Sequence, residues 1–266
     1  MPEKYRFFMM FCLINVLFFS HSLYAAMPQC QKDFTGEMKS ICTKAIKDDP
    51  EAQLQVSRYY AGQIDPSVVN YPQAFYWHRR LARLAVHLKL EDPVYSETMY
   101  NTGVFYADGL GVQQDHKKAF YWFKKAAERG DDIAMFRLAI IYSDGSGVAL
   151  DLQASLDWLK RAVVAGSLDA KVLLAQVYSE GKLVPQNNEL AVKLLREAVE
   201  QNSASARFAL GNFYLHGVEV EKSRVMAKNL FGKACRANLL EACRAYYDLD
   251  VQEESSALIP REPPIE

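Results

Sequence analysis

The chain has 266 residues, of which 50% are hydrophobic and 24% are charged, and its formal net charge at pH 7 is −1. This composition is typical of a folded globular protein and excludes a largely disordered chain. The balanced charge also disfavours a protein that binds nucleic acid or anionic lipid through a basic surplus. We therefore expect neither of them as a partner.

Residues 1–25 have the layout of a secretory signal peptide. Lys4 and Arg6 supply positive charge, residues 7–19 are almost wholly apolar, and Ala25 offers a small residue at the cleavage site. The alternative is an anchor that stays attached, but the apolar run is shorter than the about 20 residues that span a bilayer. We therefore expect cleavage and a periplasmic or secreted protein, with no stable membrane insertion and a net charge of −2.

Two segments precede a regular repeat. Residues 26–50 are expected to form an N-terminal capping segment. Residues 51–97 carry a diverged first repeat, visible in the apolar spacing of Ala52, Val56, Tyr60, Ala74 and Trp77. An excess of about nine residues around positions 86–95 follows, and we expect this extension either to lengthen a helix or to form a projecting loop.

A strict 36-residue period runs through residues 98–247. It appears in three columns, which are Gly109, Gly145, Gly181 and Gly217; Tyr106, Tyr142, Tyr178 and Tyr214; and Ala126, Ala162, Ala198 and Ala234. A fixed period of this length indicates stacked copies of one supersecondary unit. We expect four repeats here, ending in a C-terminal cap.

Each unit is predicted to be a helix–turn–helix hairpin. In residues 98–133, glycines at 109–111 break a first helix, and a second helix follows with apolar residues at 3–4 residue spacing. Helix-capping residues occur in register before the second helix, at Asp115, Asp151, Asn187 and Ser223. Residues that tolerate the left-handed conformation stand in register after it, at Gly130, Gly166, Asn202 and Asn238. The sequence therefore predicts an all-α fold.

The run from Gly103 to Val112, followed by Asp115, Ala119, Trp122, Lys125-Ala126-Ala127 and Gly130, resembles the Sel-one-like repeat, a relative of the tetratricopeptide repeat. The resemblance covers about residues 98–247. It implies a right-handed α-solenoid of about five helix-turn-helix repeats. Two positions depart from the pattern, because Leu183 and Glu219 replace the second turn glycine.

Four cysteines remain after removal of the signal: Cys30, Cys42, Cys235 and Cys243. An even number in an exported chain favours disulfides. Pairing by proximity gives Cys30–Cys42 and Cys235–Cys243, one of three possible connectivities. A four-cysteine metal site is the alternative, although it would require the two ends of the array to meet. Cys235 and Cys243 also resemble the cysteine pairs of an exported, cysteine-rich subgroup of the family, which tie adjacent repeats together.

The last segment, residues 248–266, is acidic and rich in proline, and we expect it to be a disordered tail. Elsewhere the sequence offers little chemistry. His78, His87, His116 and His216 lack a second ligand at metal spacing, and we expect no cofactor or metal. Ser179 and Lys182 form one Ser-x-x-Lys, but Gly181 is the turn glycine, whereas in penicillin-reactive enzymes this motif opens a helix. We assign no catalytic residue.

The first helices offer a candidate binding surface, because in tetratricopeptide-like hairpins they line the concave side. Variable positions there form a ladder in which apolar residues give way to polar ones along the chain. Aromatic side chains in a groove are good protein-binding anchors, although the same side chains could simply pack against adjacent helices. The ladder comprises Leu54, Arg58, Tyr100, Val104, Phe136, Ile140, Val172, Gln176, Phe208 and Asn212.

These observations favour an exported, monomeric and non-catalytic module that binds another protein in its groove. The resemblance implies adaptor or regulatory roles, and an inhibitor or immunity protein that occupies a toxin's active site is compatible with them. A cell-envelope enzyme, β-lactamase-like or acting on or binding peptidoglycan, is the alternative. A purely structural spacer is a third possibility.

Overall fold

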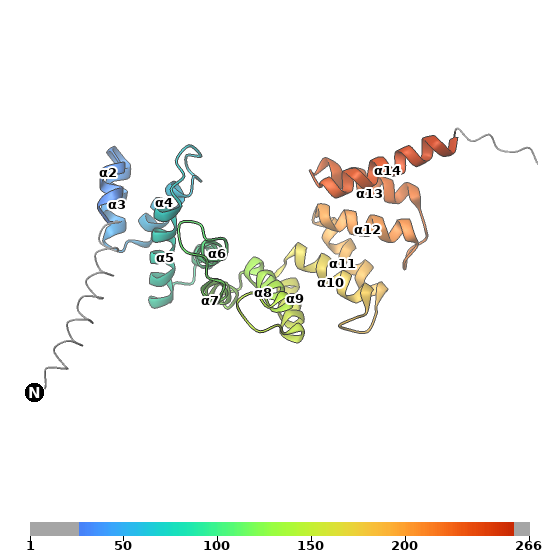
Figure 1. The fold of residues 1–266 in the computed structure, drawn as a ribbon, viewed down its shortest axis with the longest axis horizontal. Coiled ribbons are helices and arrows are strands. Elements are labelled where there is room, and N and C mark those ends of the chain that lie inside the picture. The colour runs from blue at the N-terminus through green and yellow to red at the C-terminus, as the bar shows by residue number, and fades with distance from the viewer. Residues whose placement is uncertain (1–26, 258–266) are drawn as a thin grey trace, which may run out of the picture. The chain divides into compact units, whose positions relative to one another are not determined.

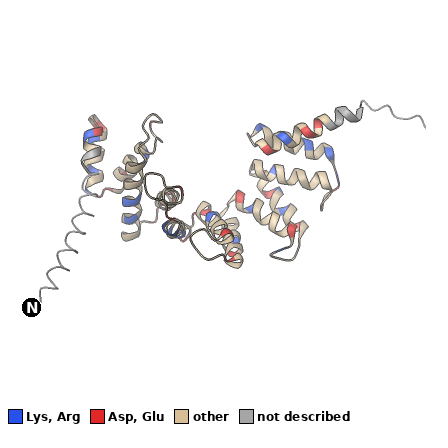
Figure 2. Ribbon diagram, viewed as in Figure 1, with Lys and Arg blue, Asp and Glu red and all other residues tan. Residues whose placement is uncertain are grey.

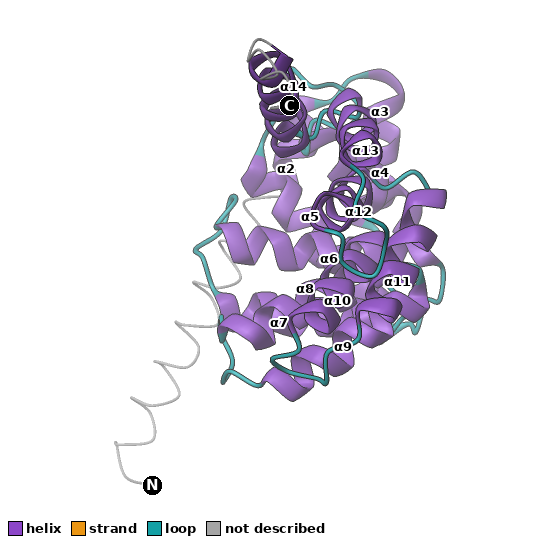
Figure 3. Ribbon diagram, turned by 90° about the vertical axis from the view of Figure 1, so that its right-hand side faces the viewer, coloured by secondary structure: helices purple, strands orange, loops and turns teal. Residues whose placement is uncertain are grey.

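In the computed structural model, residues 27–257 are described, and their regular elements are helices, with no β-strand (Figure 3). Ala61 and Val69 form one isolated antiparallel bridge. The all-α prediction is therefore confirmed for this part of the chain. The expected signal peptide, residues 1–25, and the tail from residue 258 onward lie outside the described residues.

The helices fall into two compact units (Figure 1). The first unit extends to residue 134 and includes the loop 144–150, and the second contains residues 135–143 and those from 151 onward. The first unit contains α2 (Met27–Asp33), α3 (Gly36–Ile46), α4 (Pro50–Tyr60), α5 (Tyr71–His87), α6 (Pro93–Asp108) and α7 (His116–Ala127). The second contains most of α8 (Asp132–Asp144), then α9 (Leu152–Ala165), α10 (Leu168–Glu180), α11 (Asn188–Glu200), α12 (Ala204–His216), α13 (Arg224–Arg236) and α14 (Leu240–Ala257).

The tyrosine column has the same backbone role in four repeats. The carbonyl oxygens of Tyr106, Tyr142, Tyr178 and Tyr214 each accept a hydrogen bond from the backbone N–H of the residue that caps the second helix of the same hairpin, and each bond is 2.9 Å long. This bond closes the turn between the two helices and satisfies two backbone groups at helix ends. The 36-residue period in the sequence is thus a period in the hydrogen bonding.

The predicted caps are confirmed in register. Side-chain oxygens of Asp115, Asp151 and Asn187 accept hydrogen bonds of 2.9 Å from the backbone N–H three residues later, and the Ser223 hydroxyl accepts one of 3.2 Å. At the other end of the second helices, Gly130, Gly166, Asn202 and Asn238 have φ angles between 65° and 105°. This is the left-handed region that glycine and asparagine tolerate best. The second helix of each repeat therefore has sequence-defined ends.

In the core of each of these hairpins, two facing positions, one on each helix, have side chains of complementary size. A Cβ built on Gly103 would lie 2.6 Å from the Phe123 ring, and one on Gly211 would lie 2.5 Å from the Phe231 ring. In the two repeats between them, the same register holds buried alanines, Ala139 and Ala175, with buried leucines, Leu159 and Leu195. A large ring thus occurs where the facing helix has no side chain, which keeps the interior close-packed.

The extension in the first repeat lengthens two helices. α5 has 17 residues and α6 has 16, whereas α7 has 12. Trp77 and Trp122 mark equivalent positions 45 residues apart, which is the repeat period plus the nine extra residues. In this register α7 ends where Ala82 stands in α5, so residues 83–87 form an additional turn. The first of the two expected outcomes is therefore confirmed.

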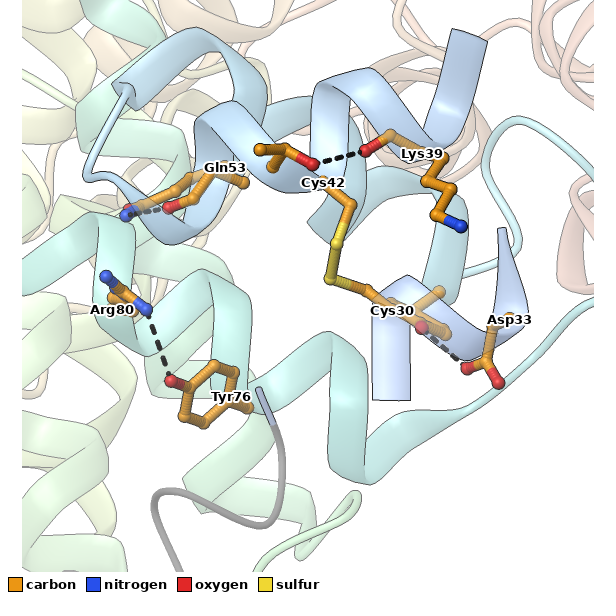
Figure 4. The surroundings of a disulfide bond; sticks show 10 residues. Cys30, Asp33, Lys39, Cys42, Gln53, Tyr76 and Arg80 are labelled. Carbon is orange, nitrogen blue, oxygen red and sulfur yellow. Dashed lines mark hydrogen bonds between the residues drawn. A yellow bond between two sulfur atoms is a disulfide. The ribbon is translucent and has the colours of Figure 1, made fainter. Parts of the chain in front are cut away.

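The N-terminal segment is held onto α4 by a disulfide, ring packing and polar contacts. Cys30 in α2 is bonded to Cys42 in α3, and both residues are fully buried (Figure 4). Phe34 packs against Tyr60 with ring centroids 5.4 Å apart, and the Tyr60 hydroxyl donates a 2.7 Å hydrogen bond to Asp33. Burial, together with this carboxylate, raises the pKa of Tyr60 above its usual value. The segment therefore covers the open side of the first hairpin.

The C-terminal end differs from its prediction. α14 continues as a helix to Ala257, so residues 248–257 are not a disordered tail. Leu249 explains the helix, because it is buried beside Ala227 and Phe231 of α13. In Figure 1, α12, α13 and α14 lie side by side, and the Cys235–Cys243 disulfide joins the last two of them. With both pairs formed, the four cysteines cannot make the alternative metal site.

Candidate functional site

The ladder residues share an intermediate degree of burial. Nine of the ten are half-buried and Gln176 is exposed. Leu54 and Arg58 lie on α4, and Tyr100 and Val104 on α6, within the first unit. Phe136, Ile140, Val172, Gln176, Phe208 and Asn212 lie on α8, α10 and α12 in the second unit. Each first helix thus presents two partly accessible side chains, one turn apart, in the same register.

Two of the aromatic rings in the ladder, those of Tyr100 and Phe208, serve internal packing in part. The rings of Tyr100 and Phe123 have centroids 5.4 Å apart, and those of Phe208 and Phe231 are 5.5 Å apart. The inner edges of Tyr100 and Phe208 therefore contact second helices, as the packing interpretation expects. Their remaining surface stays accessible, so packing and binding are compatible for these residues.

Two polar ladder residues, Arg58 and Gln176, have local partners. The Arg58 guanidinium lies 3.7 Å from the Glu97 carboxylate and links α4 to α6. The Gln176 amide donates a 2.7 Å hydrogen bond to Glu180 on its own helix. Both interactions are at the surface, where such contacts contribute about 0–1 kcal/mol. A partner could displace them at little cost.

The structure also contains a cavity that the sequence did not lead us to predict. It has a volume of about 600 Å³ and lies in the first unit, where its lining residues come from α5, α7 and, through Tyr106, α6. Its lining residues are cationic or aromatic apart from one valine. They are Arg79, Arg83, Val86, Tyr106, Lys118, Tyr121 and Trp122. The feature of the sequence that could have pointed to this cavity is the pair Arg79 and Arg83, which lie one helical turn apart on α5.

The cations in this cavity are only partly neutralised. Lys118 pairs with Asp115 at 2.8 Å, which lowers the pKa of the Asp115 carboxyl. Arg79 lies over the Phe75 ring, 5.7 Å from its centroid. Within residues 27–257, neither Arg79 nor Arg83 forms an ion pair. Burial and the neighbouring charge of Arg79 lower the pKa of Arg83.

The Ser-x-x-Lys motif lacks the arrangement of a penicillin-reactive site. Ser179 lies in the last turn of α10, and Gly181 ends that helix with a φ of 66°. The Lys182 ammonium lies 3.2 Å from Glu180 and its side chain is 82% exposed. A lysine that activates a serine would need to face it across the first turn of a helix. In the part of the chain that the structure describes, no three His, Cys, Asp or Glu side chains come together as metal ligands.

His78 is a structural residue rather than a ligand or a base. Its side chain is buried, and Nδ1 lies 2.9 Å from the carbonyl oxygen of Ala74. Burial lowers the pKa of His78 to about 4, and the nearby charge of Arg58 acts in the same direction. The imidazole is therefore neutral at pH 7 and packs beside the ring of Phe105, with centroids 5.2 Å apart.

Comparison with known proteins gives one family. A model described as the Sel1 repeat matches residues 50–86, 96–131, 132–166, 168–203 and 204–239. A Sel1 repeat protein from Oxalobacter formigenes has a similar structure, with a TM-score of 0.66 and 27% identity over 80% of this chain and 58% of the other. The protective antigen c5321 of uropathogenic Escherichia coli, which displays an SLR fold, has a TM-score of 0.67 and 26% identity over 81% of this chain and 44% of its own.

The chain thus spans about half the length of these two proteins. No curated protein matches the sequence. None of the helices in residues 27–257 combines the length and the apolar character that crossing a membrane requires.

Proposed function

Because the chain belongs to the Sel1 repeat family, we propose that it is an exported, non-catalytic module whose first-helix ladder binds a protein partner. Sel1 repeat proteins generally mediate protein–protein interactions and are typically non-catalytic scaffolds. The observation that carries the proposal is the repeated presentation of accessible side chains, half-buried except for exposed Gln176, two on each of five first helices. The first helices of helical repeats commonly provide binding surfaces, and the aromatic members of the ladder can act as anchors.

Two observations support export. The chain has two disulfides, Cys30–Cys42 and Cys235–Cys243, and disulfides persist in oxidising compartments such as the periplasm. The Escherichia coli relative is a protective antigen, which is consistent with a protein that leaves the cytoplasm. The alternative of a cell-envelope enzyme has no comparable support, because Ser179 and Lys182 lack the required arrangement.

The test compares ladder variants with a control outside the ladder. Gln176→Arg changes an exposed ladder residue, and Phe136→Asp changes a half-buried one. Val164→Asp is the control, because Val164 lies on the second helix α9 and is 89% exposed. Each protein would be used to capture partners from native periplasm, followed by mass spectrometry and circular dichroism.

We expect one stoichiometric partner that binds wild type and Val164→Asp, and that is lost from both ladder variants with the helical content unchanged. Retained binding by both ladder variants would refute the ladder as the binding surface. If the captured partner is a toxin whose activity falls in the complex, the adaptor role is replaced by that of an inhibitor. Hydrolysis of a reporter β-lactam that is abolished by Ser179→Ala would instead favour the enzyme.

A further inference from the structure

The cavity between α5 and α7 is distinct from the ladder, because it is built mainly by second helices. Arg83 and Val86 belong to the turn that α5 has gained relative to α7. Figure 2 shows Lys and Arg residues on both α5 and α7. The mature chain has a slightly negative net charge, so this positive region is a local feature rather than a general property of the surface.

The repeats provide an internal comparison for the residues that line the cavity. At the register of Arg83 the later repeats have Glu128, Val164 and Glu200, and at the register of Lys118 they have Ala154, Leu190 and Met226. At the register of Tyr121 they have Asp157, Lys193 and Asn229. The register of Arg79 is cationic in later repeats as well, at Lys124, Lys160 and Arg196, but the later repeats pack without a cation at the register of Lys118 and, apart from Arg236 in the last repeat, at that of Arg83. Packing alone therefore does not account for Arg83 and Lys118 in the first unit.

A second cavity, between α13 and α14, is also lined by three cations, of which one has an ion-pair partner in the described part of the chain. It is lined by Lys228, Lys233, Arg236 and Tyr246, among others. There the Lys228 ammonium is paired with the Asp250 carboxylate of α14. In the cavity of the first unit, the paired cation is likewise a lysine, Lys118, whereas the two cations that form no ion pair within residues 27–257 are both guanidinium groups and lie one turn apart on α5.

We propose that the Arg79–Arg83–Lys118 cavity binds the carboxylate side chains of an acidic segment in a partner protein. A guanidinium group recognises a carboxylate through two parallel hydrogen bonds, and two such groups one turn apart suit successive acidic side chains. Tyr121 and Trp122 offer apolar ring surface to the methylene groups of those side chains. The volume of about 600 Å³ exceeds what a single small anion fills and lies within the range of ligand pockets.

This site requires no ladder contact, and it adds a second point of attachment for the partner of the proposed function. Its test uses the purified mature protein and a short oligoglutamate peptide, with an oligolysine peptide of equal length as the control ligand. Binding would be measured by isothermal titration calorimetry in low and in high salt. Arg83→Glu and Arg79→Gln are the site variants, and neither arginine is buried.

Lys160→Glu is the matched control variant. Lys160 is exposed on α9 and occupies the register of Arg79 two repeats later. We expect oligoglutamate to bind with one-to-one stoichiometry, and Arg83→Glu to weaken it by at least about tenfold, which corresponds to about 1.4 kcal/mol. Lys160→Glu and the ladder variant Gln176→Arg should leave this binding unchanged. If Gln176→Arg loses the captured partner but still binds oligoglutamate, that result bears on the ladder and leaves the cavity proposal untouched.

Three results would overturn the proposal. Equal weakening by Lys160→Glu and Arg83→Glu would show non-specific attraction, and equal binding of oligolysine would exclude recognition of charge. Displacement of the peptide by inorganic phosphate at comparable concentration would show a site for small anions rather than for an acidic protein segment. High salt should weaken binding in wild type without abolishing the difference between the variants.

Discussion

Replacing Gly211 by alanine tests how tightly the hairpins are packed. An alanine normally stabilises the interior of a helix by up to about 1 kcal/mol relative to glycine. Here its Cβ would lie 2.5 Å from Cε1 and 2.8 Å from Cδ1 of Phe231. Carbon atoms in favourable contact are about 3.5–4.0 Å apart. The ring would have to move by about 1 Å, although Phe231 is fully buried beside Ala227 and Leu249.

Overpacking of this kind costs about 1–3 kcal/mol. Since the propensity gain offsets part of that cost, we expect Gly211→Ala to lower the free energy of unfolding by about 1 kcal/mol. The opposite sign is expected once the ring is removed. In a Phe231→Leu background, which reproduces the Ala175–Leu195 pair, Gly211→Ala should stabilise the protein by up to about 1 kcal/mol.

The assay is a double-mutant cycle from urea unfolding of the four proteins, followed by circular dichroism. We expect a coupling energy of about 1–3 kcal/mol between positions 211 and 231. Equal effects of Gly211→Ala in the two backgrounds would refute the steric explanation. The pair Gly103 and Phe123 offers the same cycle in the other unit.

Three further predictions concern stability. The pKa of His78 is about 4 in the folded protein and 6.5 in the unfolded chain, so below pH 6.5 the folded state binds fewer protons than the unfolded state. The free energy of unfolding should therefore fall by up to about 3 kcal/mol as the pH falls to 4. Urea midpoints plotted against pH over this range should have a shallower slope for His78→Leu than for wild type. Replacing both Cys235 and Cys243 by serine should cost about 2–3 kcal/mol and should mainly raise hydrogen exchange in α13 and α14. Asp151→Ala should cost about 1 kcal/mol in urea unfolding, because the Ala154 N–H loses its acceptor, whereas exposed Asp157→Ala on the same helix should cost less than about 0.5 kcal/mol.

Contradicting results for these three are equally specific. A pH slope that is unchanged in His78→Leu would show that other groups govern the acid sensitivity. If hydrogen exchange in the double-serine variant rises throughout the second unit, the disulfide stabilises the whole unit and not only α13 and α14. Equal costs of Asp151→Ala and Asp157→Ala would show that the cap contributes nothing beyond a surface charge.

Much of the fold could be predicted from the sequence because the residues that begin and end each helix recur in every repeat. Caps such as Asp151 and left-handed residues such as Asn202 act within a few residues of their own position, so their register in the sequence fixes the helix ends. The tail was predicted less well. The acidic composition from residue 248 onward predicts disorder, but Leu249 packs in the core beside Phe231. Composition averages over a segment, so it does not reveal that a single side chain is buried.

The cavity could not be predicted for a related reason. Arg79 and Arg83 are close in the sequence, but Lys118 and Tyr121 join them only through the packing of α7 beside the lengthened α5. That packing depends on how an irregular extension is shared between two helices. The ladder needs no such information, because each pair of its residues follows from the repeat register alone.

Site-specific photo-crosslinking in the native compartment tests the central claim most directly. A photoreactive amino acid would replace Ile140 of the ladder or, as the control, Val164 on the second helix α9. We expect a covalent adduct with one protein partner from position 140 and none from position 164. An adduct from position 164 with none from position 140 would contradict binding through the first helices.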